Sequence, residues 1–542
     1  MAVNLVYDIN DKPPFGKLLV LALQQLLAIM AATIAVPVAI GLPTQVPSAI
    51  LGAGVGTIVY LLFTRFKSPV FLGSSFAFIS SLITATAFGY LGILVGSIFA
   101  GLVYVVIAIV IHFAGTKWVS KLMPPVVIGP TVALIGLSLA GSAVTNITTA
   151  AGDTVNGGYN LVALLCGLIT FFTVVVCSGQ KRFKTMKLIP FIIGIGMGYV
   201  VAAIFTAFGL GFDVDYLKIV DFGPLVNNFV DANGNFVGVT AFLNYPDFAL
   251  IEGIKEIING ASNVTYENAA GETVQAVLLN GQGVAEVALA FIPVALVVFA
   301  EHIADHKNLS SIIGRDLVEG EPGLKRTLLG DGVGSIAGTV LGICPNTTYG
   351  ESVGCVAITG NASVRTIFVT AIMCIVLSFL SPIMALLQTI PAAVMGGVCF
   401  TLYGFIAVSG LKMFKDIDLG ENKNLFVVSA ILIAGIGGLA IRIPYHIAGN
   451  GLVDKAITVT SIATALILGI ITYAVMNRIE KSKLGQGEEE ASVPSAAVDA
   501  SVEPKLNHPE DDVPAEEDDI LTGEDAAEEN AALNTENTED EK

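Results

Sequence analysis

Charged residues are scarce in this chain of 542 residues. Asp, Glu, Lys and Arg together make up only 13 % of it, hydrophobic residues make up 54 %, and the mean hydropathy is +0.77. About a quarter of the residues of an ordinary soluble domain are charged. The composition therefore excludes a soluble globular protein and predicts one that is embedded in a membrane.

A net positive charge is also absent, because the formal net charge is −18. Residues 484–542 hold 20 acidic and 2 basic side chains, so the rest of the chain is balanced. This distribution gives no basic surface for nucleic acid, and no nucleic-acid partner is expected. The polar segment 479–542 is predicted to be a disordered, acidic, cytoplasmic tail whose role stays open.

Cysteine is rare and lacks the spacing of a disulfide framework or a zinc site. The six cysteines all lie in apolar runs, which predicts small buried side chains rather than metal ligands. The N-terminal string MAVNLVYDINDKPP also lacks the pattern of a cleaved signal peptide. The first hydrophobic run is therefore expected to remain as a membrane span.

Long apolar runs dominate what is present, and a spanning helix needs about 20 such residues. Two runs of suitable length, 69–90 and 345–365, are interrupted by GSS and PNTTYGES, which predicts extended chain followed by a half-helix. Together with the continuous runs they give fourteen predicted passes. The twelve continuous runs lie near 17–42, 46–64, 91–113, 122–144, 160–178, 188–209, 284–301, 327–344, 366–388, 390–411, 424–441 and 456–476.

The distribution of Lys and Arg predicts the orientation, since these residues concentrate in cytoplasmic loops. With fourteen passes and both termini in the cytoplasm, 21 of them fall on the cytoplasmic side and 4 on the outer side. Omission of either interrupted segment would invert this bias for half the chain. Both segments are therefore predicted to cross a plasma (inner) membrane.

The two halves of the chain are predicted to be an inverted repeat. The expected parts are a cytoplasmic N-terminus (1–13), a first seven-span repeat (14–209), an extracellular loop insertion (210–283), a second seven-span repeat (284–478) and the tail. The third span of each half is the interrupted one, and paired interruptions of this kind are typical of a transporter binding site at the bilayer midplane. The alternative is that Gly and Pro merely kink ordinary helices.

Acidic side chains are the unusual polar groups within the predicted spans, where a charge requires a partner or a function. Glu301 and Asp305 are four residues apart and share one face of a helix, and Glu351 lies in the second interrupted segment. Two nearby carboxylates in such a site cannot both be ionised cheaply, so one is expected to exchange a proton. The alternative is that Glu301 and Asp305 lie at a wet helix end.

A carboxylate also accepts the N–H groups of a planar heterocycle, and unpaired backbone N–H groups of an interrupted span can donate to its carbonyls. The sequence thus favours a carrier of a neutral cyclic imide or amide. His302 and His306 flank the acids and offer a proton relay or, less plausibly, a metal site. The glycine-rich run 330–338 lacks the context of a nucleotide-binding loop and predicts close helix packing.

Three strings in this order resemble the signature segments of a known family: FLGSSFAFIS (71–80), FAEHIADHKNL (299–309) and CPNTTYGESVGCVAITG (344–360). They are similar to those of the nucleobase-ascorbate transporter family, also called nucleobase:cation symporter-2, and specifically of its bacterial uracil permease branch. The resemblance implies an all-α polytopic membrane protein with fourteen transmembrane segments in a 7+7 inverted repeat. It further implies short antiparallel strands in spans 3 and 10, a core domain (spans 1–4 and 8–11) and a gate domain (spans 5–7 and 12–14).

The resemblance also implies roles for individual residues. Glu301 and Glu351 would hydrogen-bond uracil, and Asp305, with or without Glu301, would couple the proton. The other substrate-binding residues implied are Phe76, Tyr349 and Gly350 through their backbones, Ala32 against the ring, and Tyr403 on the gate side.

One motif position separates substrates within the family. Purine and ascorbate carriers resemble QNxGxxxxT there, whereas this chain has Glu351, which favours uracil. Asp305 departs from the best-known uracil permease, which has His at that place, and resembles some purine carriers. A xanthine or purine nucleobase symporter is therefore the alternative.

The sequence thus predicts a secondary active transporter that takes up uracil with a proton by alternating access. No enzyme activity, cofactor or resident metal is expected, and a homodimer is implied by the resemblance alone. An anion carrier or channel is disfavoured by the three intramembrane acids, and an intramembrane hydrolase would form product instead of delivering unchanged substrate. Proton against sodium coupling and the role of residues 213–280 stay open.

Overall fold

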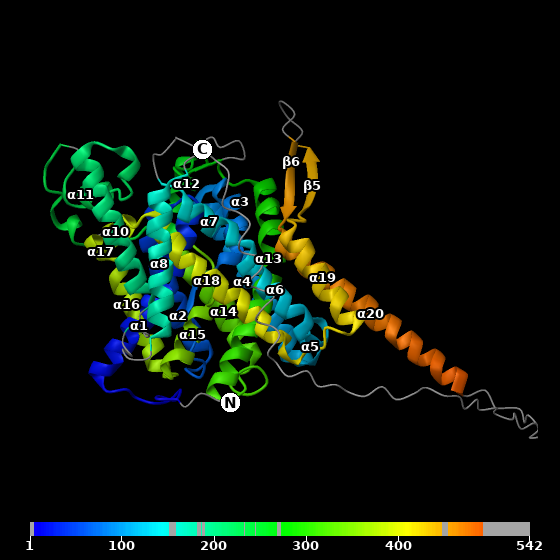
Figure 1. Ribbon diagram of the computed structural model, residues 1–542. Helices are drawn as coiled ribbons and strands as arrows, with labels where there is room; N and C mark the ends of the chain where they lie inside the picture. Colours follow the sequence, from blue (N-terminus) through cyan, green and yellow to red (C-terminus); the bar gives the residue numbers. More distant parts are fainter. Residues whose placement is uncertain are drawn as a thin grey trace, which may run out of the picture. The chain divides into compact units, whose positions relative to one another are not determined.

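The computed structural model describes residues 5–150, 159–180, 186, 190–231, 233–243, 245–267, 273–446 and 454–491. The chain divides into two units, residues 1–482 and 483–542. Almost all of the predicted acidic tail, from residue 492 onward, lies outside the described residues. The first unit is built almost entirely of helices (Figure 1).

The first half of the chain ends in α10 and contains one broken segment between α2 and α4. Its elements are α1 (Phe15–Ala39), η1 (Pro43–Gln45), α2 (Val46–Phe63), β1 (Leu72–Ser74), η2 (Phe76–Phe78), α3 (Ile79–Thr86), α4 (Gly89–Ala114), α5 (Lys117–Leu122), α6 (Pro125–Ser138), α7 (Ala140–Thr148), α8 (Leu161–Gly179) and α10 (Pro190–Phe212).

An insertion of short elements follows before the second half. It contains η4 (Asp215–Leu217), α11 (Gly223–Phe229), η5 (Gly238–Ala241), α12 (Ala249–Asn259), β2 (Thr265–Glu267) and β3 (Thr273–Gln275). The strands β2 and β3 pair in antiparallel fashion.

The second half has its own broken segment between α14 and α16. Its elements are α13 (Gly281–Ile313), α14 (Leu324–Leu341), β4 (Asn346–Thr348), α15 (Gly350–Thr359), α16 (Val364–Ser378), α17 (Ser381–Gln388), α18 (Ala392–Lys412), η6 (Met413–Asp416), α19 (Asn422–Ile436), β5 (Ile441–His446), β6 (Asp454–Val459) and α20 (Ser461–Ala491).

Within the described ranges, nine helical segments are long and apolar enough to cross a membrane. This finding supports a multi-pass membrane protein, as the composition predicts. A helix overlaps each of the twelve continuous apolar runs that the sequence analysis marked. The polar backbone is satisfied within each helix, which is the condition for a chain to cross hydrocarbon.

Two predicted boundaries are wrong. The predicted run 284–301 ends near Glu301, but α13 continues to Ile313, so Glu301 and Asp305 lie well inside a helix. The run 456–476 was begun too early, because residues 454–459 form β6, which pairs with β5 in an antiparallel hairpin. Figure 1 shows this hairpin, in gold, beyond the end of α19.

Helices at corresponding places in the two halves pack against each other. Helix α2, which follows α1 in the first half, contacts α14, which follows α13 in the second half. Helix α6 likewise contacts its counterpart α18. In the same way α4 contacts α13 and α14, whereas α16 contacts α1 and α2. These contacts of one half thus have counterparts made by the other half.

The contact between α2 and α14 depends on glycine, as the run 330–338 predicts. A Cβ atom on Gly52 of α2 would lie 2.4 Å from the carbonyl oxygen of Gly338 of α14. A Cβ atom on Gly334 would lie 2.7 Å from the carbonyl oxygen of Gly56. The backbones of α2 and α14 therefore approach at a distance that only glycine permits, and the packing role predicted for this run is confirmed.

Candidate functional site

The two broken segments meet inside the helix bundle. Strands β1 and β4 pair antiparallel, with Leu72 opposite Thr348 and Ser74 opposite Asn346, and all six residues of the pair are buried. Helical structure begins again directly after each strand, at η2 and at α15. The site is thus framed by two helix starts, whose N–H groups lack acceptors within the helix and carry a partial positive charge.

Helix α13 passes beside this strand pair and supplies two acids on one face. Asp305 is 4 % exposed, and its Oδ2 accepts a hydrogen bond from the Oγ1 atom of Thr348 at 2.8 Å. Gly350, the first residue of α15, is so close that a Cβ atom there would lie 3.5 Å from Asp305 Oδ1. Glu301 lies one turn earlier on α13 and is half-buried.

Glu351 lies in the first turn of α15 and completes the acidic group. It is 9 % exposed, and its Oε1 atom is buried without a hydrogen-bond partner among the described residues. The next residue, Ser352, fixes the start of α15 because its Oγ accepts from Gln25 Nε2 at 2.6 Å and from the N–H of Phe71 at 3.1 Å. The unpaired carboxylate oxygen is therefore held on a well-anchored turn.

A cavity of about 260 Å³ opens beside these acids. Glu301, Asp305, Gly350 and Glu351 all line it. The remaining lining residues come from α1, α6, α10 and α18 and from the ends of α13 and α15: Gln24, Ala28, Val132, Pro190, Phe191, Asn308, Gly354, Cys355, Ala357, Thr359, Phe405, Ile406, Val408, Ser409 and Lys412. The cavity thus lies between α1, α13 and α15 on one side and α6, α10 and α18 on the other.

The other residues named from the sequence lie next to this cavity rather than in its lining. The rings of Phe76 and Tyr403 meet edge to face, with centroids 5.2 Å apart. Tyr349 turns its side chain into the strand pair, where its hydroxyl donates to the carbonyl oxygen of Ser74 at 2.9 Å. Ala32 is fully buried, one helical turn beyond the lining residue Ala28.

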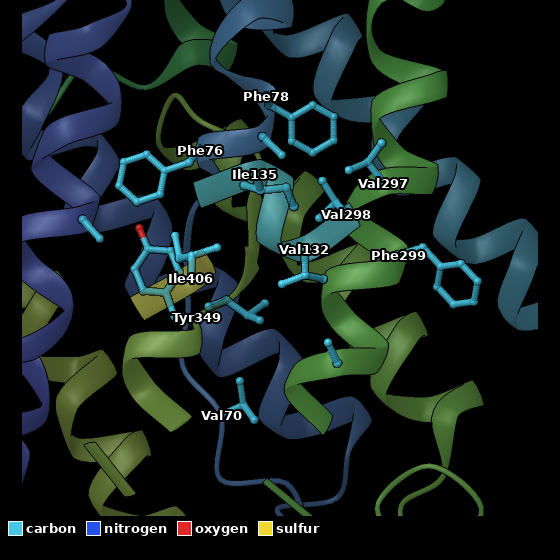
Figure 2. Close-up of a cluster of buried hydrophobic side chains, with 14 of the residues drawn as sticks. Val70, Phe76, Phe78, Val132, Ile135, Val297, Val298, Phe299, Tyr349 and Ile406 are labelled. Atoms are coloured by element: carbon cyan, nitrogen blue, oxygen red, sulfur yellow. The ribbon is translucent and has the colours of Figure 1, made fainter. Parts of the chain in front are cut away.

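Figure 2 shows Phe76, Tyr349 and Ile406 in one buried apolar cluster together with Val132 and Ile135 of α6. Because Phe76 comes from η2 and Tyr403 from α18, their contact joins the broken segment of the first half to a helix on the other side of the cavity. The two rings fill the space between η2 and α18.

A further acid, Asp331, is fully buried but is not among the predicted site residues, because its run 330–338 predicts packing alone. Asp331 lies in α14, and its Oδ2 is 2.7 Å from Nδ1 of His302. The available signal was its charge, because a lone carboxylate within a predicted span requires a partner. The partner could not be identified, since His302 is 29 residues away in the sequence.

Both histidines of the FAEHIADHKNL string are engaged with protein atoms. His302 Nε2 lies 3.0 Å from Thr327 Oγ1. His306 Nδ1 lies 2.8 Å from the carbonyl oxygen of His302, and its Nε2 lies 2.8 Å from the hydroxyl of Tyr60. These rings are fully buried and do not line the cavity. The two rings therefore pack against protein away from the cavity. Each of their ring nitrogens already lies within hydrogen-bond distance of a protein atom.

Comparison with known proteins gives consistent matches along most of the chain. The sequence profile of the Permease family matches residues 16–238 and 263–443. A uracil permease from Bacillus caldolyticus is 36 % identical over 474 residues, which cover 87 % of this chain and 94 % of that protein. The uracil permease of Bacillus subtilis (strain 168) is 34 % identical over 490 residues, covering 90 % and 98 %. The uracil permease of Escherichia coli (strain K12) is 31 % identical over 439 residues, covering 80 % and 88 %.

Solved structures of low sequence identity share the fold. The transmembrane domain of a cyanobacterium bicarbonate transporter, BicA, superposes with a TM-score of 0.50 at 13 % identity, covering 86 % of this chain and 100 % of that one. Murine Solute Carrier 26 family member A9, an anion transporter in the inward-facing state, superposes with a TM-score of 0.53 at 12 % identity, covering 87 % and 69 %. At these identities the likeness extends to the fold alone.

Proposed function

Because this chain belongs to the nucleobase:cation symporter-2 permease family, we propose that it takes up uracil together with a proton across the plasma membrane by alternating access. The chain is a permease, like its named relatives, and not an enzyme. Uracil is the substrate that the names of its relatives give for those proteins, and the arrangement of acids around the cavity suits this ring.

The observation that carries the proposal is the unpaired Oε1 atom of Glu351 beside the cavity. A buried polar atom without a partner is costly, so its persistence indicates that a ligand supplies the missing donor. The imide of uracil offers N–H donors to the carboxylates of Glu351 and Glu301, and its carbonyl groups accept from the backbone N–H groups at the start of α15. Both polar edges of one small ring are satisfied in this way.

The remaining proposed contacts require the elements around the cavity to close on the ring. The backbones of Phe76, Tyr349 and Gly350 contact the base, Ala32 packs on its face, and Tyr403 lines the opposite side. Of these residues, only Gly350 lines the cavity in this conformation. The others lie within the adjoining strand pair and aromatic contact, at the places where such a movement would bring them onto the base.

The proton is proposed to reside on Asp305, with Glu301 as its neighbour on the same helix face. Glu301, Asp305, Glu351 and Asp331 lie close enough for their charges to interact. They cannot all be ionised at once in a buried site, so one proton is shared among them. The hydroxyl of Thr348 stabilises the charged form of Asp305 and thereby links strand β4 to its proton.

The architecture proposed for this function is a fourteen-span inverted repeat. The core domain consists of α1–α4 and α13–α16 with the two strands, and the gate domain consists of α6–α10 and α18–α20. The matched contacts between the halves support a pseudo-two-fold relation, because elements near such an axis meet their own counterparts. The position of the cavity between α1, α13, α15 and α6, α10, α18 supports the division into core and gate.

The side on which the cavity opens follows from the proposed orientation. Its lining includes Lys412 at the end of α18 and Thr359 at the end of α15, whereas Phe76 and Tyr403 close the opposite direction. With both termini in the cytoplasm, Lys412 belongs to the positively charged inner side. This conformation is therefore proposed to be inward-facing, and dimerisation through the gate domain is part of the same proposal.

A xanthine or purine nucleobase is the second candidate, and Asp305 is the observation that favours it. The resemblance places His at this position in the best-known uracil permease and Asp in some purine carriers, and Asp305 lines the cavity directly. Competition between labelled uracil and unlabelled xanthine for uptake distinguishes the two substrates. Stronger competition by xanthine than by unlabelled uracil would assign the site to a purine.

The test of the proposed function is uptake of labelled uracil by proteoliposomes with an imposed pH gradient. The wild-type protein is expected to accumulate unchanged uracil when the outside is acidic and to stop when a protonophore removes the gradient. The Glu351→Gln variant is expected to lose affinity, and Asp305→Asn is expected to lose the response to the gradient. Accumulation that is unaffected by the protonophore and by both substitutions would refute the mechanism.

A further inference from the structure

Helix α12 lies in the insertion between the two halves, in a stretch that the family profile does not match. The family profile matches up to residue 238 and again from 263, so α12 (Ala249–Asn259) falls in the unmatched stretch. The helix is nevertheless attached to the spanning helices, because it contacts α4 and α14. This helix of the insertion is therefore packed onto the spanning helices.

The attachment is made by small residues and one buried acid on a single face of α12. Ala249, Gly253 and Glu256 are the buried residues of the helix. A Cβ atom on Gly253 would lie 3.0 Å from a side-chain carbon of Leu91, so the two helices approach closely here. The N–H group of Ala249 donates to the carbonyl oxygen of Gly342, directly after α14, at 3.0 Å.

Glu256 fixes α12 at the N-terminus of a spanning helix. Its two carboxylate oxygens accept the N–H groups of Tyr90 and Leu91, each at 3.0 Å, and Oε1 also accepts from Ser262 Oγ at 2.6 Å. Tyr90 and Leu91 lie in the first turn of α4, where N–H groups lack helical acceptors and favour an anion. Gly89, with φ +65°, lets the chain pass against this carboxylate.

The level of α12 relative to the membrane follows from these contacts. It lies where α4 begins and α14 ends, and α4 is long enough, at 26 residues, to cross the whole hydrocarbon layer. The start of a full-length span lies at the boundary between lipid and water. Helix α12 therefore lies along this boundary and not above it.

The remaining surface of α12 is divided into an apolar face and a polar face. The apolar face consists of large aliphatic residues that remain 39 % to 76 % exposed, and Ile258 is the most exposed of them. The polar face carries Glu252 and Lys255, which form an ion pair at 2.5 Å. At 100° per residue the apolar face lies on the flank away from this pair. The apolar face is Leu250, Ile251, Ile254, Ile257 and Ile258.

We propose that α12 is an interfacial helix, whose apolar face inserts into the headgroup and acyl boundary of the lipid bilayer. Three adjacent faces, one bound to protein, one apolar and one charged, match the three environments that meet at the edge of a spanning helix. The apolar face lies at the same depth as the start of α4, where lipid surrounds that spanning helix. A lipid surface accordingly fits it without any additional protein, and Glu256 holds the helix in the plane of the membrane.

The test relies on tryptophan fluorescence, which is practical because the chain has a single tryptophan, Trp118, that can be replaced. In a Trp118→Phe background, tryptophan is introduced by Ile254→Trp or Ile258→Trp on the apolar face and by Lys255→Trp on the polar face as the matched control. Each full-length variant is reconstituted in phosphatidylcholine vesicles with and without acyl-chain bromine. Bromolipid is expected to quench the Ile254→Trp and Ile258→Trp variants at least twofold more than the Lys255→Trp variant, and aqueous iodide is expected to show the opposite order.

Equal quenching of all three variants by iodide would overturn the proposal, because it would place the apolar face in water. Protection of Ile254→Trp and Ile258→Trp from both quenchers would also overturn it, since a second copy of the chain would then cover the face. If the substitutions prevent folding, wild-type protein in vesicles with a photoactivatable lipid decides the matter. Labelling of residues 249–259 is expected, and its absence would refute the proposal. These outcomes do not depend on the transported substrate.

Discussion

Two buried glutamates face helix starts and differ in their hydrogen bonds. Glu256 lies near the end of α12 and faces the first turn of α4, whereas Glu351 lies in the first turn of α15 itself. Glu256 is 4 % exposed and accepts three hydrogen bonds, two of them from the first turn of α4. Glu351 is 9 % exposed, lies in the first turn of α15 beside a cavity, and keeps one oxygen without a partner among the described residues. Both acids are buried and both lie against a helix start, so the clearest difference between them is whether the carboxylate is fully hydrogen-bonded.

The difference indicates opposite roles for the two acids. A buried carboxylate whose oxygens are all bonded to protein stabilises the fold, and its removal leaves the donors without an acceptor. A buried carboxylate with an open oxygen is maintained at a cost in stability, which is typical of a ligand site. Variants of the two residues should therefore affect stability and transport in opposite ways.

The largest effect is expected for Glu256→Ala, which leaves the N–H groups of Tyr90 and Leu91 and the hydroxyl of Ser262 without an acceptor. The loss of these bonds should destabilise the protein by about 3 kcal/mol. The midpoint of thermal denaturation in detergent should fall by several degrees, while the uracil affinity of the folded fraction stays the same. The Glu252→Ala variant is the control, because among the described residues the Glu252 carboxylate bonds to Lys255 alone. Equal loss in both variants would contradict a special role for Glu256.

Glu351→Gln should show the reverse pattern. The amide keeps the shape of the side chain but loses the charge that accepts the substrate N–H group, and hydrogen bonds to charged groups contribute about 1.5 to 3 kcal/mol. The apparent KM for uracil uptake should rise about 10- to 100-fold, with the denaturation midpoint unchanged. A lowered midpoint together with an unchanged KM would reverse the assignment of the two acids.

Asp305→Asn separates the proton from the substrate. The amide oxygen still accepts from Thr348, but the side chain no longer ionises. Wild-type initial uptake should fall by up to about tenfold for each unit of rising external pH, as for a step that requires one proton. The variant should give a flat profile across the same pH series. If the variant kept the wild-type slope, the proton would be assigned to Glu301 instead of Asp305.

Thr348→Val is expected to give the smallest effect, because it removes one neutral donor from Asp305. A net loss of about 1 kcal/mol corresponds to an uptake rate that is lower by about fivefold. The control is Thr347→Val, since adjacent residues of a strand point to opposite faces. Equal effects of both substitutions would mean that the hydroxyl acts through strand packing alone.

The interrupted segments were predictable from the sequence because their physical signal is local. GSS and PNTTYGES place glycine, proline and hydroxyl groups within apolar runs, and strands β1 and β4 lie at these places. Glu301 and Asp305 were predictable as a pair from their spacing of four residues on a helix, and both line the cavity. The family was likewise evident from three strings.

The partners of the buried acids were not predictable, because each comes from a distant part of the chain. Glu256 bonds to a helix that begins 167 residues earlier, and nothing near Asp331 indicated His302. The end of α13 was misplaced for a related reason. An acid in a span was interpreted as the end of the run, whereas Thr348 gives Asp305 a partner that allows the helix to continue.

Equilibrium binding of labelled uracil to purified protein tests the central claim most directly, with wild type, Glu351→Gln and Glu256→Gln compared under identical conditions. The account predicts that Glu351→Gln weakens binding at least tenfold and that Glu256→Gln stays within twofold of wild type. Wild-type affinity in Glu351→Gln, or an equal loss in both variants, would contradict it.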